Sequence, residues 1–202
     1  MIKSGLTLFC LLVLLGCQTK TPSYAESYIN CEENKQNLKI TDDATIIPYI
    51  PPECIIGYEL PHFSIETING RNITTQSLKG KLSIINFWFG SCPPCLAEIP
   101  GLNLLKEKYG TRNVNYIAIS TDRTKDVRYY IEKYPFNFEH VADGNKIYRE
   151  TFNAKWGFPF TIISDRNNKI LASFAGGPTD STAIEKVISK IEPILLREKA
   201  KR

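Results

Sequence analysis

Two cysteines separated by two residues carry the most distinctive chemistry of this chain. The motif Cys92-Pro93-Pro94-Cys95 follows directly on an apolar run over residues 82–89. Thiols at this spacing can close a small disulfide ring, and a strand that leads straight into such a pair presents it at the edge of a sheet. The motif therefore predicts a redox centre that performs thiol–disulfide exchange.

Cys92 is the expected nucleophile of the pair. It lies just before a predicted helix, where unpaired backbone N–H groups and the helix dipole lower the pKa of a thiol below its usual value of about 8.5. Cys95, one helical turn on and expected to be more buried, would resolve the mixed disulfide. Pro93 and Pro94 have no N–H group, so the thiolate must rely on the Cys95 N–H and its neighbours. A less stabilised thiolate predicts a more reducing pair.

The sequence on both sides of the motif predicts the strand and the helix that position it. Residues 82–89 are nearly all apolar, as in a central strand that is covered on both faces. Residues 96–109 have helical spacing, with Gly110 as a stop signal and Pro100 as an expected kink. A buried strand followed by a helix is the arrangement that holds a cysteine pair at a helix N-terminus.

The rest of the chain after about residue 58 alternates strands and helices, which predicts an α/β domain. Residues 63–75 alternate around Asn69-Gly70, the signal of a two-residue type I′ hairpin turn. Further strands are expected over residues 114–119, 161–164 and 169–174, and further helices over residues 125–134, 145–152 and 182–196.

Two segments and two single residues together resemble a known family. These are residues 86–95 (NFWFGSCPPC) and 157–161 (GFPFT), with Glu98 and Pro100 between them. They resemble thioredoxin-fold proteins of the TlpA/ResA type, which are extracytoplasmic, membrane-tethered disulfide reductases. The resemblance implies a thioredoxin-like α/β fold in which helices flank a central mixed sheet, with an N-terminal β-hairpin extension. Asn86, where cytosolic thioredoxins have a buried aspartate, agrees with this exported group.

The same resemblance implies roles around the cysteines. Glu98 would approach the pair and help to manage its proton, although a glutamate on a helix is otherwise more often solvated. Pro159 matches the cis-proline that lies against the disulfide, where the backbone before it can pair with an extended substrate. Phe158 would add an apolar substrate contact, and Trp88 would either line the site or be a core aromatic. Ser91 departs from the family pattern, which usually has tryptophan there, so substrate choice does not carry over.

The N-terminus predicts export and lipid attachment. Lys3 and the apolar residues 6–15 have the form of a signal peptide. The sequence Leu14-Leu15-Gly16-Cys17 resembles the lipobox of bacterial lipoproteins, in which the cysteine becomes the lipidated first residue. An ordinary secretory signal is the alternative. Either way the domain is expected on the extracytoplasmic face of a bacterial membrane.

The expected organisation has four parts. Residues 1–16 form a lipoprotein signal peptide, residues 17–57 a lipid-anchored tether, residues 58–196 the thioredoxin-like domain, and residues 197–202 a solvated charged tail. Cys31 and Cys54 lie in the tether. In an oxidising compartment they are expected to form a structural disulfide, and exchange of either one with the active pair is the rival possibility.

Other functions are less well supported by the sequence. A net charge of +4, without a block of like charges, excludes a typical nucleic-acid-binding surface. A zinc site would need a second cysteine pair or histidines near the first, and His62 and His140 are isolated. We therefore expect no metal and no cofactor beyond the Cys92–Cys95 disulfide.

Two alternatives remain open. A peroxiredoxin-like thiol peroxidase would share the order of elements, but its nucleophile normally follows a threonine three residues earlier, where this chain has Phe89. A non-catalytic tethered binding module would use Cys92–Cys95 only as a structural bond. The expected partners of a reductase are a disulfide-bearing protein, such as apocytochrome c or a metal-site assembly protein, and a membrane thiol transporter that supplies electrons.

Overall fold

The computed structural model of the chain describes residues 20–33, 36–39 and 46–201, with only the backbone for residues 36–39 and 46–48. The predicted signal peptide and Cys17 lie outside the described residues. Among the residues that are described, no helix combines the length and the apolar character that a membrane span requires.

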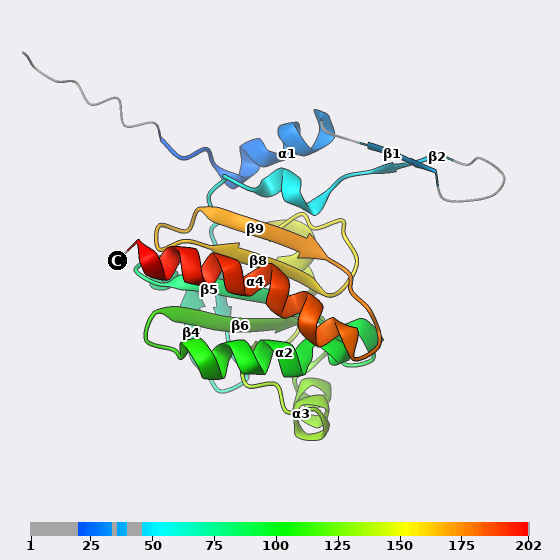
Figure 1. Cartoon of the computed structure of the whole chain (residues 1–202), viewed down its shortest axis with the longest axis vertical. Coiled ribbons are helices and arrows are strands. Elements are labelled where there is room, and N and C mark those ends of the chain that lie inside the picture. The colour runs from blue at the N-terminus through cyan, green and yellow to red at the C-terminus, as the bar shows by residue number, and fades with distance from the viewer. Residues whose placement is uncertain (1–19, 34–35, 40–45, 202) are drawn as a thin grey trace, which may run out of the picture.

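A five-stranded mixed sheet forms the centre of the molecule (Figure 1). Its strand order is β7-β6-β5-β8-β9, with β5, β6 and β7 parallel to one another and β8 antiparallel to both of its neighbours. The central strand is β5, as the sequence predicted. The strands span Leu82–Trp88 (β5), Val114–Ser120 (β6), Glu139–Val141 (β7), Phe160–Ser164 (β8) and Ile170–Ala175 (β9).

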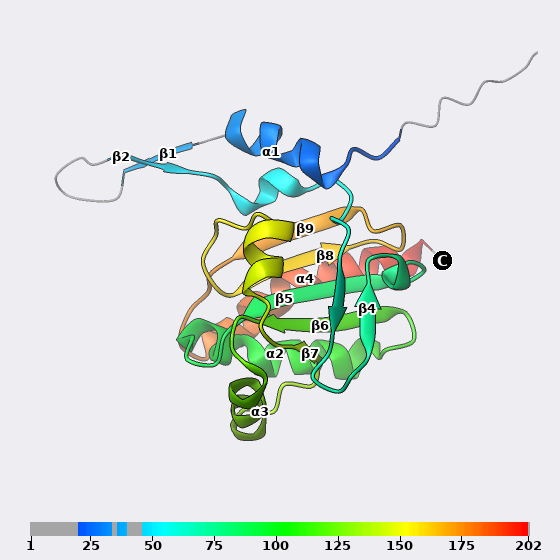
Figure 2. The same ribbon diagram turned by 180° about the vertical axis from the view of Figure 1, so that it is seen from behind.

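Different elements cover the two faces of this sheet. Helices α2 and α4 pack side by side on one face (Figure 1), and the β3–β4 hairpin and the π-helical turn η3 lie on the other (Figure 2). Helix α3 follows β6. The bounds are Ser64–Glu66 (β3), Asn72–Thr74 (β4), Gln76–Leu78 (η2), Pro93–Tyr109 (α2), Thr124–Lys133 (α3), Ile147–Thr151 (η3) and Thr182–Ala200 (α4).

The alternation of side chains along β5 divides the core in two. Ile84 and Trp88 pack with α2 and α4, whereas Ile85 and Phe87 pack against the elements on the opposite face. Every residue of β5 is buried, because both faces of the sheet are covered. Asn86 points to the same face as Ile84 and Trp88, and it is therefore directed toward α2.

The β3–β4 hairpin is present, but the expected type I′ turn is wrong. The Gly70 N–H donates to the Thr67 carbonyl (2.9 Å), and the Thr67 N–H donates to the Arg71 carbonyl (2.8 Å). Of the two central residues only Gly70 has a positive φ (81°), whereas a type I′ turn requires it at both. The connection is therefore a three-residue loop with a bulge at Gly70, the next most common hairpin connection.

Much of the segment that was expected to be a tether is folded against the domain. It contains helix α1 (Tyr24–Glu33), the antiparallel strands β1 (Gln36–Lys39) and β2 (Ile46–Tyr49), and the 3₁₀ turn η1 (Pro52–Ile55). Tyr24 and Cys31 of α1 join the core cluster of the sheet face that η3 covers. Helix α1 and the turn η1 therefore form part of the globular structure, whereas the β1–β2 hairpin projects away from it (Figure 1).

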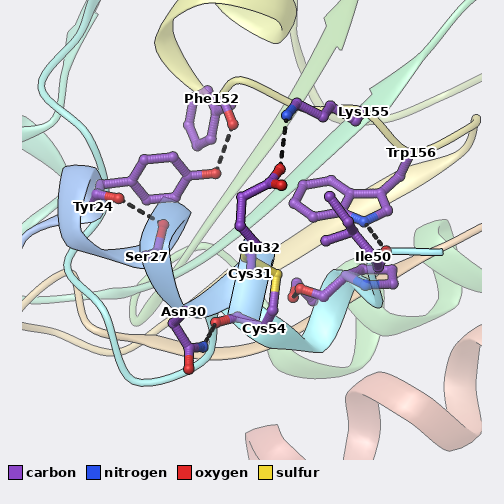
Figure 3. Close-up of a disulfide and its surroundings, with 12 residues drawn as sticks. Tyr24, Ser27, Asn30, Cys31, Glu32, Ile50, Cys54, Phe152, Lys155 and Trp156 are labelled. Atoms are coloured by element: carbon purple, nitrogen blue, oxygen red, sulfur yellow. Dashed lines mark hydrogen bonds and ion pairs between the residues drawn. A yellow bond between two sulfur atoms is a disulfide. The ribbon is translucent and has the colours of Figure 1, made fainter. Parts of the chain in front are cut away.

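The disulfide between Cys31 and Cys54 joins α1 to η1 (Figure 3). The Asn30 side-chain amide also donates to the Cys54 carbonyl (2.7 Å). On the domain side, the Ser173 hydroxyl of β9 donates to the Pro52 carbonyl (2.6 Å). The N-terminal segment is thus closed by a covalent bond and attached to the edge strand of the sheet.

The expected charged tail is also wrong in part, because α4 continues to Ala200. Glu198 has a side chain that is only 5% exposed, and it lies near Arg166 (4.0 Å) and Lys201 (2.5 Å). The Arg166 guanidinium additionally donates to the Glu198 carbonyl (3.2 Å). The two Arg166 contacts connect the last turn of the helix to the β8–β9 turn.

Candidate active site

Cys92 and Cys95 form a disulfide at the N-terminus of α2. Strand β5 ends at Trp88, and the three residues that follow lead to Cys92, which caps the helix. The helix then starts with Pro93, a residue that is favoured at the first helical position because its missing N–H would have no partner there. The strand and the helix therefore place the pair as the sequence predicted.

The Cys95 N–H donates to the Cys92 sulfur over 3.3 Å. Pro93 and Pro94 provide no N–H group, so this donor is the first that the helix offers to the sulfur. In the reduced protein the same N–H would face a Cys92 thiolate.

The expectation that Cys95 is more buried than Cys92 is wrong for the oxidised state. Each cysteine is only 2% exposed. Both belong to the core cluster formed with α2 and α4, and the disulfide joins the cap residue of α2 to the first turn of the helix. In the oxidised state a partner therefore finds little exposed surface of either cysteine to contact.

Glu98 is buried behind the disulfide, one turn further along α2, and is 5% exposed. The Asn86 side-chain amide donates to Glu98 Oε1 (2.8 Å) and to Thr161 Oγ1 (2.9 Å). Burial raises the pKa of the Glu98 carboxyl to about 7, and the Asn86 hydrogen bond and the charge of Lys190 oppose this rise. Glu98 can therefore gain and lose a proton near neutral pH.

We expect the Glu98 carboxyl to titrate near pH 7 in the folded, oxidised protein, compared with 4.5 for an ordinary glutamate. Between these two values the folded state holds a proton that the unfolded state has released, so stability falls as the pH rises through this window. Carbon-13 NMR of the glutamate carboxyls would measure the midpoint, and Glu98→Gln would identify the signal. The part of the pH dependence of stability that Glu98 contributes should disappear in this variant, and a midpoint below pH 5 would contradict the expectation.

Trp88 is a core aromatic, the second of the two alternatives that the sequence left open, and it is not placed to contact a substrate. Its side chain is 1% exposed, and its ring packs edge-on against Phe136 (5.6 Å between centroids) and His140 (5.8 Å). It lies in the same core cluster as the two cysteines. Its position on the α2 face of the central strand makes it a packing residue beneath the disulfide.

Phe158 and Pro159 lie next to the loop that carries the cysteines. The Phe158–Pro159 peptide bond is cis, as the family resemblance implies. The half-buried Phe158 ring contacts the Phe89 ring edge-on (5.3 Å between centroids), and the Phe89 carbonyl accepts from the Cys92 N–H (3.2 Å). The loop before β8 therefore contacts Phe89, which is hydrogen-bonded to Cys92, through the Phe158 ring.

The N-terminal segment contacts the chain before β8 through three polar interactions (Figure 3). The Trp156 indole N–H donates to the Ile50 carbonyl (2.7 Å), Lys155 pairs with Glu32 (3.3 Å), and the Tyr24 hydroxyl donates to the Phe152 carbonyl (2.8 Å). Residues 152–156 are thus held by the segment that the Cys31–Cys54 disulfide closes. Sequence reasoning did not foresee this support.

Two further residues of the site were not predicted. Thr161 and Lys190 were not singled out, although Asn86 was noted as a family marker. In the observed register Asn86 lies opposite Thr161, a pairing that requires knowing that β5 and β8 are neighbours. The sequence signal available was that Asn86 is the single polar residue among the alternate positions of β5 that face α2, where the others are Leu82, Ile84 and Trp88.

The described residues include no cluster of three or more histidine, cysteine, aspartate or glutamate side chains that is arranged as a metal site. Cys31 and Cys54 are bonded to each other, and the disulfide joins Cys92 to Cys95. These four thiols are therefore unavailable as zinc ligands in the oxidised protein.

Comparisons with known proteins agree with this site. The AhpC/TSA family model matches residues 56–189. The thiol-disulfide oxidoreductase ResA of Bacillus cereus (strain ZK / E33L) is 32% identical over 140 residues, which cover 68% of this chain and 79% of that protein.

Solved structures show the same fold. A protein of Chlorobium tepidum that is assigned as the thiol:disulfide interchange protein DsbE is 25% identical, with a TM-score of 0.56 over 65% of this chain and 94% of that one. The thioredoxin domain of a thiol-disulfide oxidoreductase from Bacteroides vulgatus is 26% identical, with a TM-score of 0.54 over 66% of this chain and 97% of that one. The predicted thioredoxin-like fold is confirmed.

Proposed function

Because the chain belongs to the AhpC/TSA family and is a thioredoxin-like thiol-disulfide oxidoreductase, we propose that it reduces disulfides of other proteins on the extracytoplasmic side of a bacterial membrane. The observation that carries this proposal is the Cys92–Cys95 pair at the N-terminus of α2, with the buried Glu98 behind it.

The reaction would proceed in two exchange steps. In the reduced protein the Cys92 thiolate attacks one sulfur of a substrate disulfide, which forms a Cys92–substrate disulfide and releases the other substrate sulfur as a thiolate. Cys95 then attacks the Cys92 sulfur and releases the second substrate thiolate. Two electrons pass to the substrate, and the Cys92–Cys95 disulfide is left behind. A membrane thiol transporter is the proposed donor that reduces it again.

Glu98 is proposed to accept the Cys95 proton when Cys95 becomes the attacking thiolate. Its burial and its pKa of about 7 support this role, because a general base works best when its pKa lies near the working pH. Phe158 and Pro159 are proposed to contact the substrate beside the redox pair.

Export, lipid attachment and partners belong to the same proposal. Cys17 is proposed as the lipidated residue after removal of residues 1–16, with the following segment connecting the lipid to the folded part. Apocytochrome c or a metal-site assembly protein is the kind of substrate that a membrane-tethered reductase would serve.

The direction of exchange is tested by the reduction potential of the Cys92–Cys95 pair. With Pro93 and Pro94 at the start of α2, the thiolate has few N–H donors, which favours a reducing pair. We expect a value near thioredoxin's, about −270 mV, from equilibration of the soluble domain with dithiothreitol. A value near that of a strong oxidant, about −120 mV, would reverse the proposed direction.

A further inference from the structure

A small cavity lies between α4 and the end of β9, and Glu98 is one of its lining residues. Its volume is about 10 Å³, close to what one water molecule requires. Glu98 contributes a carboxyl that is otherwise sealed in the core. The other lining residues are Phe174, Gly176, Gly177, Pro178, Ala183, Lys186, Val187 and Lys190.

Two lysines of α4 border this cavity, and they differ in their surroundings. Lys190 is partly buried, and its ammonium lies 4.4 Å from the centroid of the Phe174 ring. Lys186 lies one turn earlier on α4 and is exposed to solvent. Phe174 thus holds the Lys190 charge close to the cavity, where screening by water is weaker than at the surface.

We propose that Lys190 is a positioning residue that sets the protonation of Glu98 across this cavity. The inference rests on the proposed role of Glu98 in thiol–disulfide exchange and identifies the residue that tunes it. Lys190 does not touch the reacting sulfur atoms in this arrangement, and it acts through the carboxyl.

The other groups around Glu98 leave the lysines of α4 as the nearby source of positive charge. Asn86 of β5 and Thr161 of β8 are neutral, and the cysteines of α2 carry no charge while they form the disulfide. The charge of Lys190 lowers the pKa of Glu98 against the larger effect of burial. Removing that charge should therefore leave the carboxyl protonated to a higher pH.

Lys190 is itself subject to opposing influences. Burial and the neighbouring charge of Lys186 lower its pKa, whereas Glu53 and Glu98 raise it. Glu53 belongs to η1, next to the Cys54 that is bonded to Cys31. One carboxylate of the N-terminal segment therefore helps to keep Lys190 charged.

The test compares Lys190→Gln with Lys186→Gln as a matched control on the same helix and cavity. In the oxidised protein, carbon-13 NMR would follow the Glu98 carboxyl, identified by its loss in Glu98→Gln. We expect Lys190→Gln to raise the Glu98 midpoint by roughly 0.2 to 0.7 of a pH unit, the size expected for a partly screened ion pair. Lys186→Gln should shift it less, and Lys190→Arg should keep the wild-type midpoint.

Equal shifts in the two glutamine variants, or no shift in Lys190→Gln, would overturn the inference. The rate of exchange in the reduced protein tests the proposed role of Glu98 separately. Two results together would separate the proposals: the NMR midpoint of Glu98 moves in Lys190→Gln, and the pH profile of exchange is unchanged in Glu98→Gln. In that case Lys190 affects the protonation of the carboxyl, but the proposed role of Glu98 in exchange is wrong.

Discussion

Replacing Cys92 with serine should abolish the reduction of protein disulfides, with a loss on the order of 10³-fold or more, because a hydroxyl cannot replace the thiolate that starts the exchange. The serine side chain fits the same position at the cap of α2 and can still accept from the Cys95 N–H. The loss should therefore be one of chemistry. Reduction of insulin by a stoichiometric amount of previously reduced protein would measure it, and thermal unfolding of both proteins in the reduced state would exclude a folding defect.

Cys95→Ser is the matched variant for this result. It retains the nucleophile and removes the residue that resolves the intermediate, so a Cys92–substrate disulfide should accumulate. Mass spectrometry of the trapped species would identify the cysteine that carries the substrate. Substrate attached to Cys95 in the Cys92→Ser protein, together with an active Cys92→Ser enzyme, would contradict the assigned order of attack.

Removing the Cys31–Cys54 disulfide should lower the free energy of unfolding by about 3 kcal/mol, as the chain-entropy relation predicts for a loop of this length. The two cysteines are 23 residues apart in sequence. The double variant Cys31→Ser/Cys54→Ser would be compared with wild type by urea unfolding at constant pH. The reference variant is Cys92→Ser/Cys95→Ser, whose disulfide spans only three residues and should contribute less.

The Cys31→Ser/Cys54→Ser variant also tests which part of the structure the disulfide stabilises. Trp156 donates to Ile50 in the N-terminal segment, whereas Trp88, the second of the two tryptophans, is sealed in the core. In a Trp88→Phe background, the fluorescence of Trp156 would report on this contact alone. Loss of the contact at low urea, before the main transition, would show that the segment unfolds separately. An unchanged unfolding midpoint would contradict the expected stabilisation.

The elements that carry the site could be predicted because their sequence signals are local. The nearly all-apolar run of β5 and the helical spacing of α2 predicted strand and helix in the correct places, and the cysteine spacing predicted the redox pair. The sequence placed the C-terminal end of α4 at residue 196 and not at Ala200, because a glutamate such as Glu198 is usually exposed. Its burial depends on Arg166, which lies 32 residues away in the chain.

Other features depend on contacts between distant segments and were missed for that reason. Strand β7 has only three residues, and it lacks a turn signal like the Asn69-Gly70 pair that marked the equally short β3 and β4. Helix α1 is only weakly amphipathic, and the buried face that holds Tyr24 and Cys31 becomes apparent only against the domain. The contact of Asn86 with Glu98 and Thr161 likewise requires the strand order, which no short sequence motif encodes.

The burial of both sulfur atoms in the oxidised protein bears on how electrons enter it. Cys92 and Cys95 are each 2% exposed, and exchange requires a thiolate to approach along the sulfur–sulfur axis. A small thiol such as glutathione has little surface with which to displace the residues that cover this axis, whereas a protein donor can do so by docking. The oxidised form should therefore exchange slowly with soluble thiols, and its redox state would be set by the flux between its protein partners.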